Sequence, residues 1–182
     1  RIVPGFPRET INEIKEEVGF DDNLVVKAEL YHLWAIGGPG YKKVMEVLPL
    51  DKAGLHVIFM PSIKQFRDKK VRILNGSHTG MVTMALMMGC ETVMDAFNTP
   101  AIEKFVNDMV AEEVIPMIEE DQEELKAFAS SILERFYNPY IKHMLKSISL
   151  NSLSKWEARN YPTVKDNWFK AGKVAEHEAM TF

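Results

Sequence analysis

The chain has 182 residues, of which 46% are apolar and 26% are charged, and its formal net charge is −4. This length and composition allow one sizeable domain, or a domain with a small attachment. Because acidic and basic residues are interspersed, the composition argues against nucleic acid as the main partner. Cys90 is the single cysteine, which excludes a disulfide framework and is typical of a reducing cytoplasm. No apolar run reaches about 18 residues and no signal-peptide pattern is present, so we expect neither a membrane span nor a secretory leader.

The first helix is expected soon after the N-terminus. Residues 1–8 contain two prolines and a glycine and predict an extended connector. Thr10 and Glu13 have the spacing of a capping box, in which a hydroxyl and a carboxylate satisfy the amides at a helix start. We therefore expect a helix from Thr10 to about Val18, ended by Gly19.

Two apolar runs in the first third of the chain predict strands. Glu29–Ile36 carries aromatic and apolar residues without helical caps, and Leu55–Met60 is a short continuous apolar run. Between them, Gly37–Gly40 contains three glycines and a proline. It lacks the G-x-G-x-x-G spacing of a dinucleotide-binding loop, so we expect a turn rather than a phosphate site.

Helical patterning predominates from residue 63 to the end. The four methionines of residues 71–88 are expected to fill gaps in a helical core, and the acidic run Glu119–Glu124 is expected to be a solvated helix start. The fold is therefore predicted to be mainly α, with one or two strands near the N-terminus. The expected helical segments are 63–70, 71–88, 92–97, 99–118, 125–137, 140–150 and 155–159, followed by a tail from Pro162 to Phe182.

Lys70, Asn75 and His78 follow the spacing K-x4-N-x2-H. A lysine, an amide and an imidazole can together hold a carbonyl or hydroxyl oxygen and move a proton on it. On an ideal α-helix the three side chains point to about 0°, 140° and 80° and share a broad face. Asn75 and His78 are then neighbours, whereas Lys70 lies about 12 Å of helical rise from His78. The alternative is that Lys70 is a solvated lysine, Asn75 a helix cap and His78 a hydrogen-bonded core histidine.

Three further histidines form no metal-binding pattern. His32 and His56 lie in predicted strands and are expected to be packed or at a domain junction, and His177 lies in the tail. The sequence has no HExxH motif and no cluster of cysteine and histidine, so no metal site is predicted.

The segment Lys70–His78, KVRILNGSH, resembles the catalytic motif of the mannitol dehydrogenase family, the long-chain polyol dehydrogenases. Three other elements agree with this resemblance, which covers roughly Arg1 to Arg159. They are Arg1-Ile2-Val3-Pro4, which looks like the end of a D-R-I-x-P signature, Glu29–Ile36, which resembles an E-x-F-x-x-W-V-I strand, and Arg135-Phe136-Tyr137-Asn138-Pro139, which resembles an R-F-x-N-P element.

The resemblance implies a multi-helical C-terminal substrate domain, of the 6-phosphogluconate-dehydrogenase-like type, from an NAD-dependent oxidoreductase. Residues 1–62 would be the junction with an N-terminal Rossmann domain that binds NAD, and residues 63–182 the helical domain, cut short at its end. Lys70 would exchange the proton as general acid or base, and Asn75 and His78 would donate hydrogen bonds to the same oxygen.

Within the family, Asn138–His143 looks most like the branch that interconverts D-altronate and D-tagaturonate. Such a substrate carries a carboxylate, which cations would bind. The candidate ligands are Arg135, Lys142 and His143, with Lys155 and Arg159 as weaker candidates.

Other assignments stay open. Within the family they are the branch that reduces fructuronate and a mannitol-type polyol enzyme. The alternative that is not an enzyme is a helical binding module, in which the K-x4-N-x2-H residues have no catalytic role.

Overall fold

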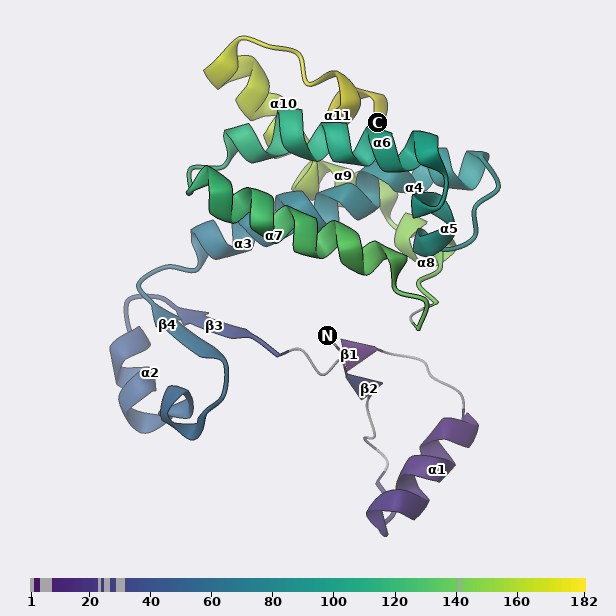
Figure 1. The fold of residues 1–182 in the computed structure, drawn as a ribbon. Helices are drawn as coiled ribbons and strands as arrows, with labels where there is room; N and C mark the ends of the chain where they lie inside the picture. The colour runs from purple at the N-terminus through teal and green to yellow at the C-terminus, as the bar shows by residue number, and fades with distance from the viewer. Residues whose placement is uncertain (1, 4–7, 23, 25–26, 29–31, 141) are drawn as a thin grey trace. The chain divides into compact units, whose positions relative to one another are not determined.

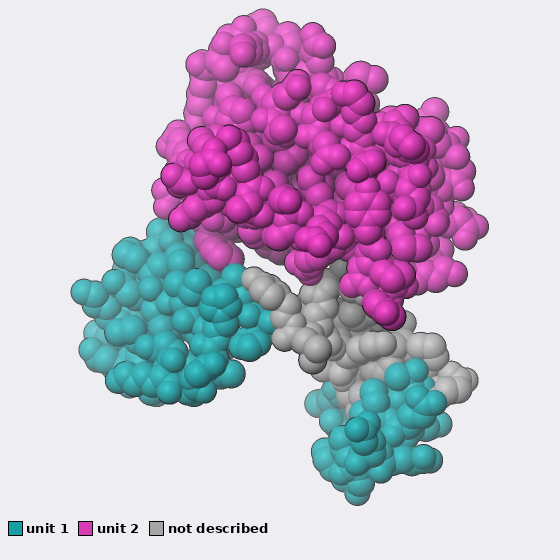
Figure 2. Space-filling view, viewed as in Figure 1, with its two compact units in different colours: residues 1–63 teal, residues 64–182 magenta. Residues whose placement is uncertain are grey.

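The computed structural model describes residues 2–3, 8–22, 24, 27–28, 32–140 and 142–182. The chain divides into two compact units, residues 1–63 and residues 64–182, which Figure 2 shows in separate colours. The named strands lie in the first unit, and the second is built from helical segments (Figure 1). The predicted mainly α fold, with its strands near the N-terminus, is confirmed. Among the described helices, none combines the length and the apolar character that crossing a bilayer requires.

The first unit begins with a short strand pair and a helix. The strands β1 (Ile2–Val3) and β2 (Lys27–Ala28) pair antiparallel, and α1 covers Arg8–Val18. Because α1 starts two residues before Thr10, the predicted capping box is wrong, and Thr10 lies inside the first turn. Gly19 ends the helix as predicted, with a φ of 76° that favours glycine.

A second strand pair is parallel. β3 (Trp34–Gly37) runs beside β4 (Val57–Met60). Parallel strands need a crossover, which α2 (Tyr41–Val47) and the 3-10 turn η1 (Leu50–Ala53) provide. The predicted strands at Glu29–Ile36 and Leu55–Met60 overlap β3 and β4, although residues 29–31 lie outside the described residues. The turn predicted at the glycine cluster is confirmed.

The central element of the second unit is one continuous helix that contains a π turn. α3 (Lys64–Lys70), the π turn η2 (Val71–Gly76) and α4 (Ser77–Met87) follow one another without a break. The helices predicted for residues 63–70 and 71–88 are therefore confirmed. The other segments are α5 (Val93–Phe97), α6 (Pro100–Asp108), η3 (Met109–Val114), η4 (Ile115–Met117), α7 (Gln122–Glu134), η5 (Arg135–Tyr137), α8 (Leu145–Ser149), α9 (Ser152–Arg159), α10 (Tyr161–Asp166), η6 (Asn167–Ala171) and α11 (Glu176–Met180).

The core of the second unit surrounds α4, which packs against α5, α6, α8 and α9. A helix enclosed in this way is apolar or small on every side, and Met81, Val82 and Ala85 are buried. Gly80 allows the closest approach, because a Cβ there would lie 3.1 Å from Thr181 and 3.2 Å from the Met109 sulfur. The large residues Phe97, Ile102, Leu125, Ile132 and Leu145 complete this core.

Three predictions about this unit are wrong in part. Met87 and Met88 are 84% and 52% exposed, because the end of α4 extends past the packed part of the bundle. Glu120, predicted to be solvated, is only 16% exposed in its side chain and forms an ion pair with Lys69. The segment predicted to be helical from residue 140 becomes helical only at Leu145, where α8 begins.

Candidate active site

The three motif residues lie on the continuous helix formed by α3, η2 and α4. Lys70 ends α3, Asn75 lies inside the π turn η2, and His78 is the second residue of α4. A π turn closes on residues i and i+5, so the five-residue step from Lys70 to Asn75 makes about one turn. The separation of about 140° expected on an ideal α-helix does not apply across a π turn. We therefore expect Lys70 and Asn75 to lie closer to each other around the helix than on an ideal α-helix.

Lys70 differs from the two basic residues beside it. Lys69 Nζ lies 2.7 Å from Glu120 Oε2, and Arg72 Nη1 lies 2.6 Å from Asp166 Oδ2, so both of these charges are paired. Lys70 is exposed, and it has no hydrogen bond or ion pair with any residue that the structure describes. Its ammonium is therefore available to a ligand.

His78 is positioned by its own helix and by two neighbouring rings. Its Nδ1 lies 2.8 Å from the Leu74 carbonyl oxygen. Because a carbonyl only accepts, Nδ1 carries a proton, and Nε2 is the acceptor of the neutral ring. The ring centroids of Phe136 and His143 lie 4.3 Å and 5.1 Å from that of His78. These contacts hold the imidazole in one orientation, with a second imidazole beside it.

Asn75 has a polar atom without a partner. Its side-chain Oδ1 is buried and accepts no hydrogen bond from any described residue. Its backbone carbonyl, in contrast, accepts from Thr79 Oγ1 at 3.0 Å. Leaving a buried acceptor unsatisfied costs roughly 1–3 kcal/mol, and a ligand hydroxyl would remove this cost. Asn75 lies inside the helix, so the alternative that it is a helix cap is wrong.

The element Arg135–His143 places two rings against His78, those of Phe136 and His143. His143 lies beside His78, and its carbonyl is fixed by the Val93 amide at 3.0 Å. Arg135, at the start of η5, and Lys142 are both exposed. The structure therefore brings His143 to the motif and leaves Lys142 on the surface.

The end of α9 holds the motif helix from another side. Arg159 Nη1 donates to Thr79 Oγ1 at 3.0 Å, and Asn160 Nδ2 donates to the Gly76 carbonyl at 3.2 Å. A Cβ at Gly76 would lie 3.7 Å from the Arg159 carbonyl. The glycine of the motif therefore faces the backbone at the end of α9.

A buried acidic cluster on this side was missed from the sequence. Glu178 is fully buried, and Glu113 is 7% exposed. The Glu113 carboxylate accepts from the backbone amides of His177 and Glu178 and from His177 Nδ1, at 2.8–2.9 Å. Glu178 Oε2 accepts from Asn160 Nδ2 at 2.7 Å. The available signal was the pair Glu112-Glu113 within the otherwise apolar segment η3.

Burial determines the protonation of Glu178. It raises the pKa of Glu178 to about 8, against the lowering effect of the hydrogen bond from Asn160, and the nearby Glu113 charge raises it further. Glu178 is therefore mostly protonated at neutral pH. The sharing of Asn160 between Glu178 and Gly76 connects the cluster to the π turn.

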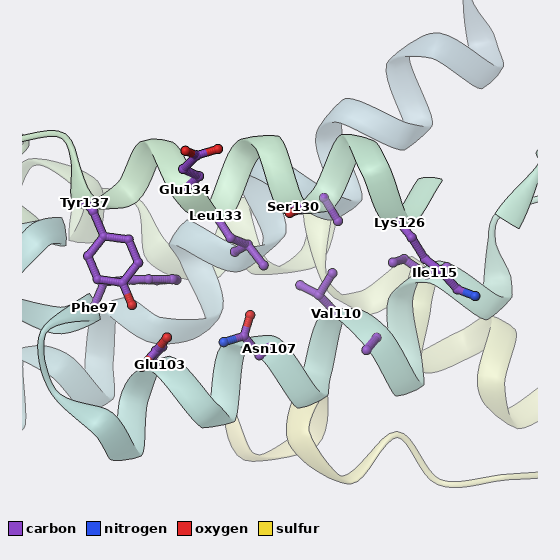
Figure 3. A pocket seen from close by; sticks show the side chains of 12 residues that line it. Phe97, Glu103, Asn107, Val110, Ile115, Lys126, Ser130, Leu133, Glu134 and Tyr137 are labelled. Carbon is purple, nitrogen blue, oxygen red and sulfur yellow. The ribbon is translucent and has the colours of Figure 1, made fainter. Parts of the chain in front are cut away.

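A groove of about 530 Å³ opens on another part of this unit. One of its walls is formed by α6 and η3, and the opposite wall is formed by α7. Figure 3 shows Val110 and Leu133 directed toward it from opposite walls, with Tyr137 at one end. Burial, and then a hydrogen bond with Glu103, raises the pKa of Tyr137. None of the three motif residues lines this groove, so we do not assign it to the site.

The described residues contain no group of three or more histidine, cysteine, aspartate or glutamate side chains that could hold a metal ion. His32 and His56 are exposed, so of the two expectations for them packing is wrong, and a place at a domain junction stays a prediction. The His56 amide donates to His32 Nε2 at 3.1 Å.

Comparison with known proteins gives one family. Residues 62–180 match the mannitol dehydrogenase C-terminal domain. The chain is 42% identical over 182 residues to an altronate oxidoreductase of Bacillus subtilis, covering 100% of this chain and 37% of that protein. It is 43% identical over 174 residues to one of Bacteroides thetaiotaomicron, covering 96% of this chain and 36% of that protein. It therefore spans little more than a third of the curated relatives.

Two solved structures share the fold. A D-sorbitol dehydrogenase in substrate-free form has a TM-score of 0.72 at 23% identity, covering 91% of this chain and 34% of that one. A Pseudomonas fluorescens mannitol 2-dehydrogenase, in a ternary complex with NAD and D-mannitol, has a TM-score of 0.71 at 21% identity, covering 100% and 36%.

Proposed function

The chain belongs to the mannitol dehydrogenase family, and on that premise we propose that it is the catalytic, substrate-binding domain of an oxidoreductase. The reaction is the interconversion of D-altronate and D-tagaturonate with NAD. Relatives that align with nearly the whole chain are altronate oxidoreductases, which supports this substrate. The full protein would carry an N-terminal Rossmann domain, for which the greater length of the relatives leaves room, and would work in the cytoplasm.

One observation carries the proposal. Lys70 is the basic residue of the motif without an acidic partner among the described residues, and it lies about one π turn from Asn75. His78 follows Asn75 at i+3, which makes the two neighbours on successive turns. We therefore place an ammonium, an amide and an imidazole together on one helix, with Lys70 at the exposed end of α3.

This set of side chains fits half of an alcohol–ketone reaction. Oxidation of a secondary alcohol removes a proton and a hydride, and lysine, asparagine and histidine can handle the proton but not the hydride. The set therefore requires a redox cofactor, and NAD, when bound, would accept or supply the hydride. No G-x-G-x-x-G segment is present in this sequence, so the nucleotide would be held mainly by the preceding domain.

The residues of the chain then act on one oxygen. In reduction, the Lys70 ammonium donates a proton to the oxygen as it becomes an alkoxide, and in oxidation the free amine takes the hydroxyl proton. The Asn75 amide donates a hydrogen bond that stabilises the developing charge. Nδ1 of His78 is hydrogen-bonded to the Leu74 carbonyl, so Nε2 is assigned the contact with the substrate. As imidazolium, His78 donates a hydrogen bond from Nε2, and as neutral imidazole it accepts one at Nε2 from a substrate hydroxyl.

The sugar acid would also contact the element Arg135–His143. His143, whose ring lies beside that of His78, is proposed to bind the substrate next to the reacting oxygen. Arg135 and Lys142 are exposed, and as cations they would attract an anionic substrate.

The test is the substitution Lys70→Met in the full-length protein, with NADH-dependent reduction of D-tagaturonate as the assay. Loss of a general acid lowers kcat by roughly 10²–10⁴-fold. Lys64→Met, an exposed lysine on the same helix, is the control and should retain wild-type activity. A Lys70→Met enzyme within a few-fold of wild type would refute the catalytic assignment. D-fructuronate and D-fructose are assayed in parallel, because a clear preference for either would replace the proposed substrate.

A further inference from the structure

The helix α9 presents two cations without an acidic partner. Lys155 and Arg159 lie at i and i+4, so their side chains occupy the same side of the helix. Both are half-buried, and neither forms an ion pair with an acid among the residues that the structure describes. Like charges at this spacing repel each other. The pair is therefore unfavourable unless an anion joins it.

Neutral oxygen atoms hold both side chains in place. Arg159 Nη1 donates to Thr79 Oγ1 at 3.0 Å, and Lys155 Nζ donates to the Ile148 carbonyl at 2.8 Å. A guanidinium has five N–H donors and an ammonium three. Each contact thus orients a cationic group while occupying only part of its donor capacity.

Among the described residues, no acid neutralises the charge of Arg159. Burial lowers the pKa of Lys155, and the charge of Arg159 lowers it further, while burial also lowers the pKa of Arg159. An arginine nevertheless keeps its proton in proteins. Removing such a charge from water without a counter-charge is costly, and charged groups in this situation are concentrated at functional sites.

The pair lies next to the motif. Thr79, which accepts from Arg159, donates its hydroxyl to the Asn75 carbonyl at 3.0 Å. His78 and Thr79 are at i+3 and i+4 from Asn75, so both are its neighbours on the following turn. Asn75 therefore has the imidazole on one side and the contact with Arg159 on the other.

We propose that Lys155 and Arg159 bind the carboxylate of the sugar acid whose reacting oxygen lies at Lys70, Asn75 and His78. The assignment rests on the proposed function and adds the residues that select an acid over a neutral sugar. A guanidinium fork and an ammonium match the two oxygens of a carboxylate. A neutral ketohexose would leave both charges without an anion, and the site would disfavour it for that reason.

The same two cations could instead bind a phosphate of the nucleotide. The two anions are distinguished by which Michaelis constant responds, that of NADH or that of the ketouronate. We favour the carboxylate because Arg159 is held through Thr79 directly to Asn75, a residue placed at the reacting oxygen.

The experiment measures kcat/KM of the full-length protein for D-tagaturonate and for D-tagatose, in which a hydroxymethyl group replaces the carboxylate. The variants are Arg159→Met, Arg159→Lys and Lys155→Met, with Lys146→Met, an exposed lysine of α8, as the control. Removing one partner of a buried charge pair has large effects, so Arg159→Met should lower kcat/KM for the ketouronate on the order of 100-fold. We expect about 10-fold for Lys155→Met, an intermediate loss for Arg159→Lys, and a few-fold change or less for D-tagatose.

A fall in the ratio of the two kcat/KM values, with an unchanged KM for NADH, supports the assignment. Equal losses on both substrates would show that the pair is structural, and a raised KM for NADH alone would move it to the nucleotide. If Arg159→Met does not fold, Lys155→Met still tests the assignment, because the hydrogen bond of Lys155 goes to the Ile148 carbonyl and the bond from Arg159 to Thr79 is kept. If the wild-type enzyme turns over a ketouronate and the variants keep the wild-type ratio of the two kcat/KM values, only this assignment is refuted. Wild-type turnover of ketohexoses alone defeats the proposed function as well.

Discussion

Two charged clusters lie against the central helix of the second unit, and they carry opposite signs. The acidic cluster consists of Glu113 and Glu178, and the basic pair consists of Lys155 and Arg159. In the acidic cluster, Glu178 takes a proton at neutral pH, and backbone amides and Asn160 donate to three of the four carboxylate oxygens, whereas Glu178 Oε1 has no partner among the described residues. Within the part of the chain that the structure describes, the hydrogen bonds of the basic pair go to two neutral oxygen atoms.

The difference follows from the chemistry of the side chains. A buried carboxyl can become neutral by gaining a proton when its pKa rises, whereas a guanidinium cannot lose one at any ordinary pH. Glu178 can neutralise itself and on this argument contributes to structure. Arg159 cannot do so and on this argument contributes to binding, because the missing counter-charge must come from a ligand. On this comparison, removing the first cluster should change stability and removing the second should change function.

The largest stability effect is expected for Glu178→Gln in the full-length protein. The pKa of Glu178 is about 8 in the folded chain and 4.5 ordinarily. Because the folded value is raised, the contribution of this group is fully present below pH 4.5 and is lost as pH rises to about 8. Wild type should therefore lose about 2–4 kcal/mol across this range relative to Glu178→Gln, which has no proton to lose.

Thermal unfolding of both proteins at several values between pH 5 and pH 9 measures this difference. The titratable and charged groups near Glu178 are Glu113, His177 and Arg72, and these stay in place in the variant, as does the hydrogen-bond donor Asn160. A midpoint difference that does not change with pH would show that Glu178 is not a protonated, structural acid.

A much smaller and opposite effect is expected for Lys155→Met. The substitution removes one of two repelling charges and keeps the apolar stem, so the unfolding midpoint should stay constant or rise, by an amount equivalent to about 0–1 kcal/mol. The measurement is thermal unfolding without substrate, beside Lys146→Met. A clear loss of stability in Lys155→Met would mean that Lys155, like Glu178, has a structural role. It would contradict the proposed difference between the acidic cluster and the basic pair.

The sequence located the motif but not its geometry. K-x4-N-x2-H and its flanks predicted Lys70, Asn75 and His78 as one group on a helix. The π turn could not be predicted, because the Gly76 carbonyl finds its donor in Asn160, 84 residues further along the chain. Local periodicity contains no information about such a distant partner.

The same limit applies elsewhere in the second unit. Apolar patterning placed most helices, but it could not show where packing ends, so exposed Met87 and Met88 were expected in the core. Glu113 and Glu178 are 65 residues apart, and nothing in either local segment points to the other. Arg159 was only a weak candidate because its importance comes from a contact with Thr79 that tertiary structure alone provides.

The central claim is that the Lys70 side chain carries the proton of the reaction, and chemical rescue tests it most directly. Lys70→Ala in the full-length protein removes the amine and leaves space on the exposed end of α3. Added methylamine should restore D-tagaturonate reduction in proportion to its concentration, and amines of different pKa should differ in a regular order. Absence of rescue in a folded Lys70→Ala protein, or activity that never falls, would contradict the account.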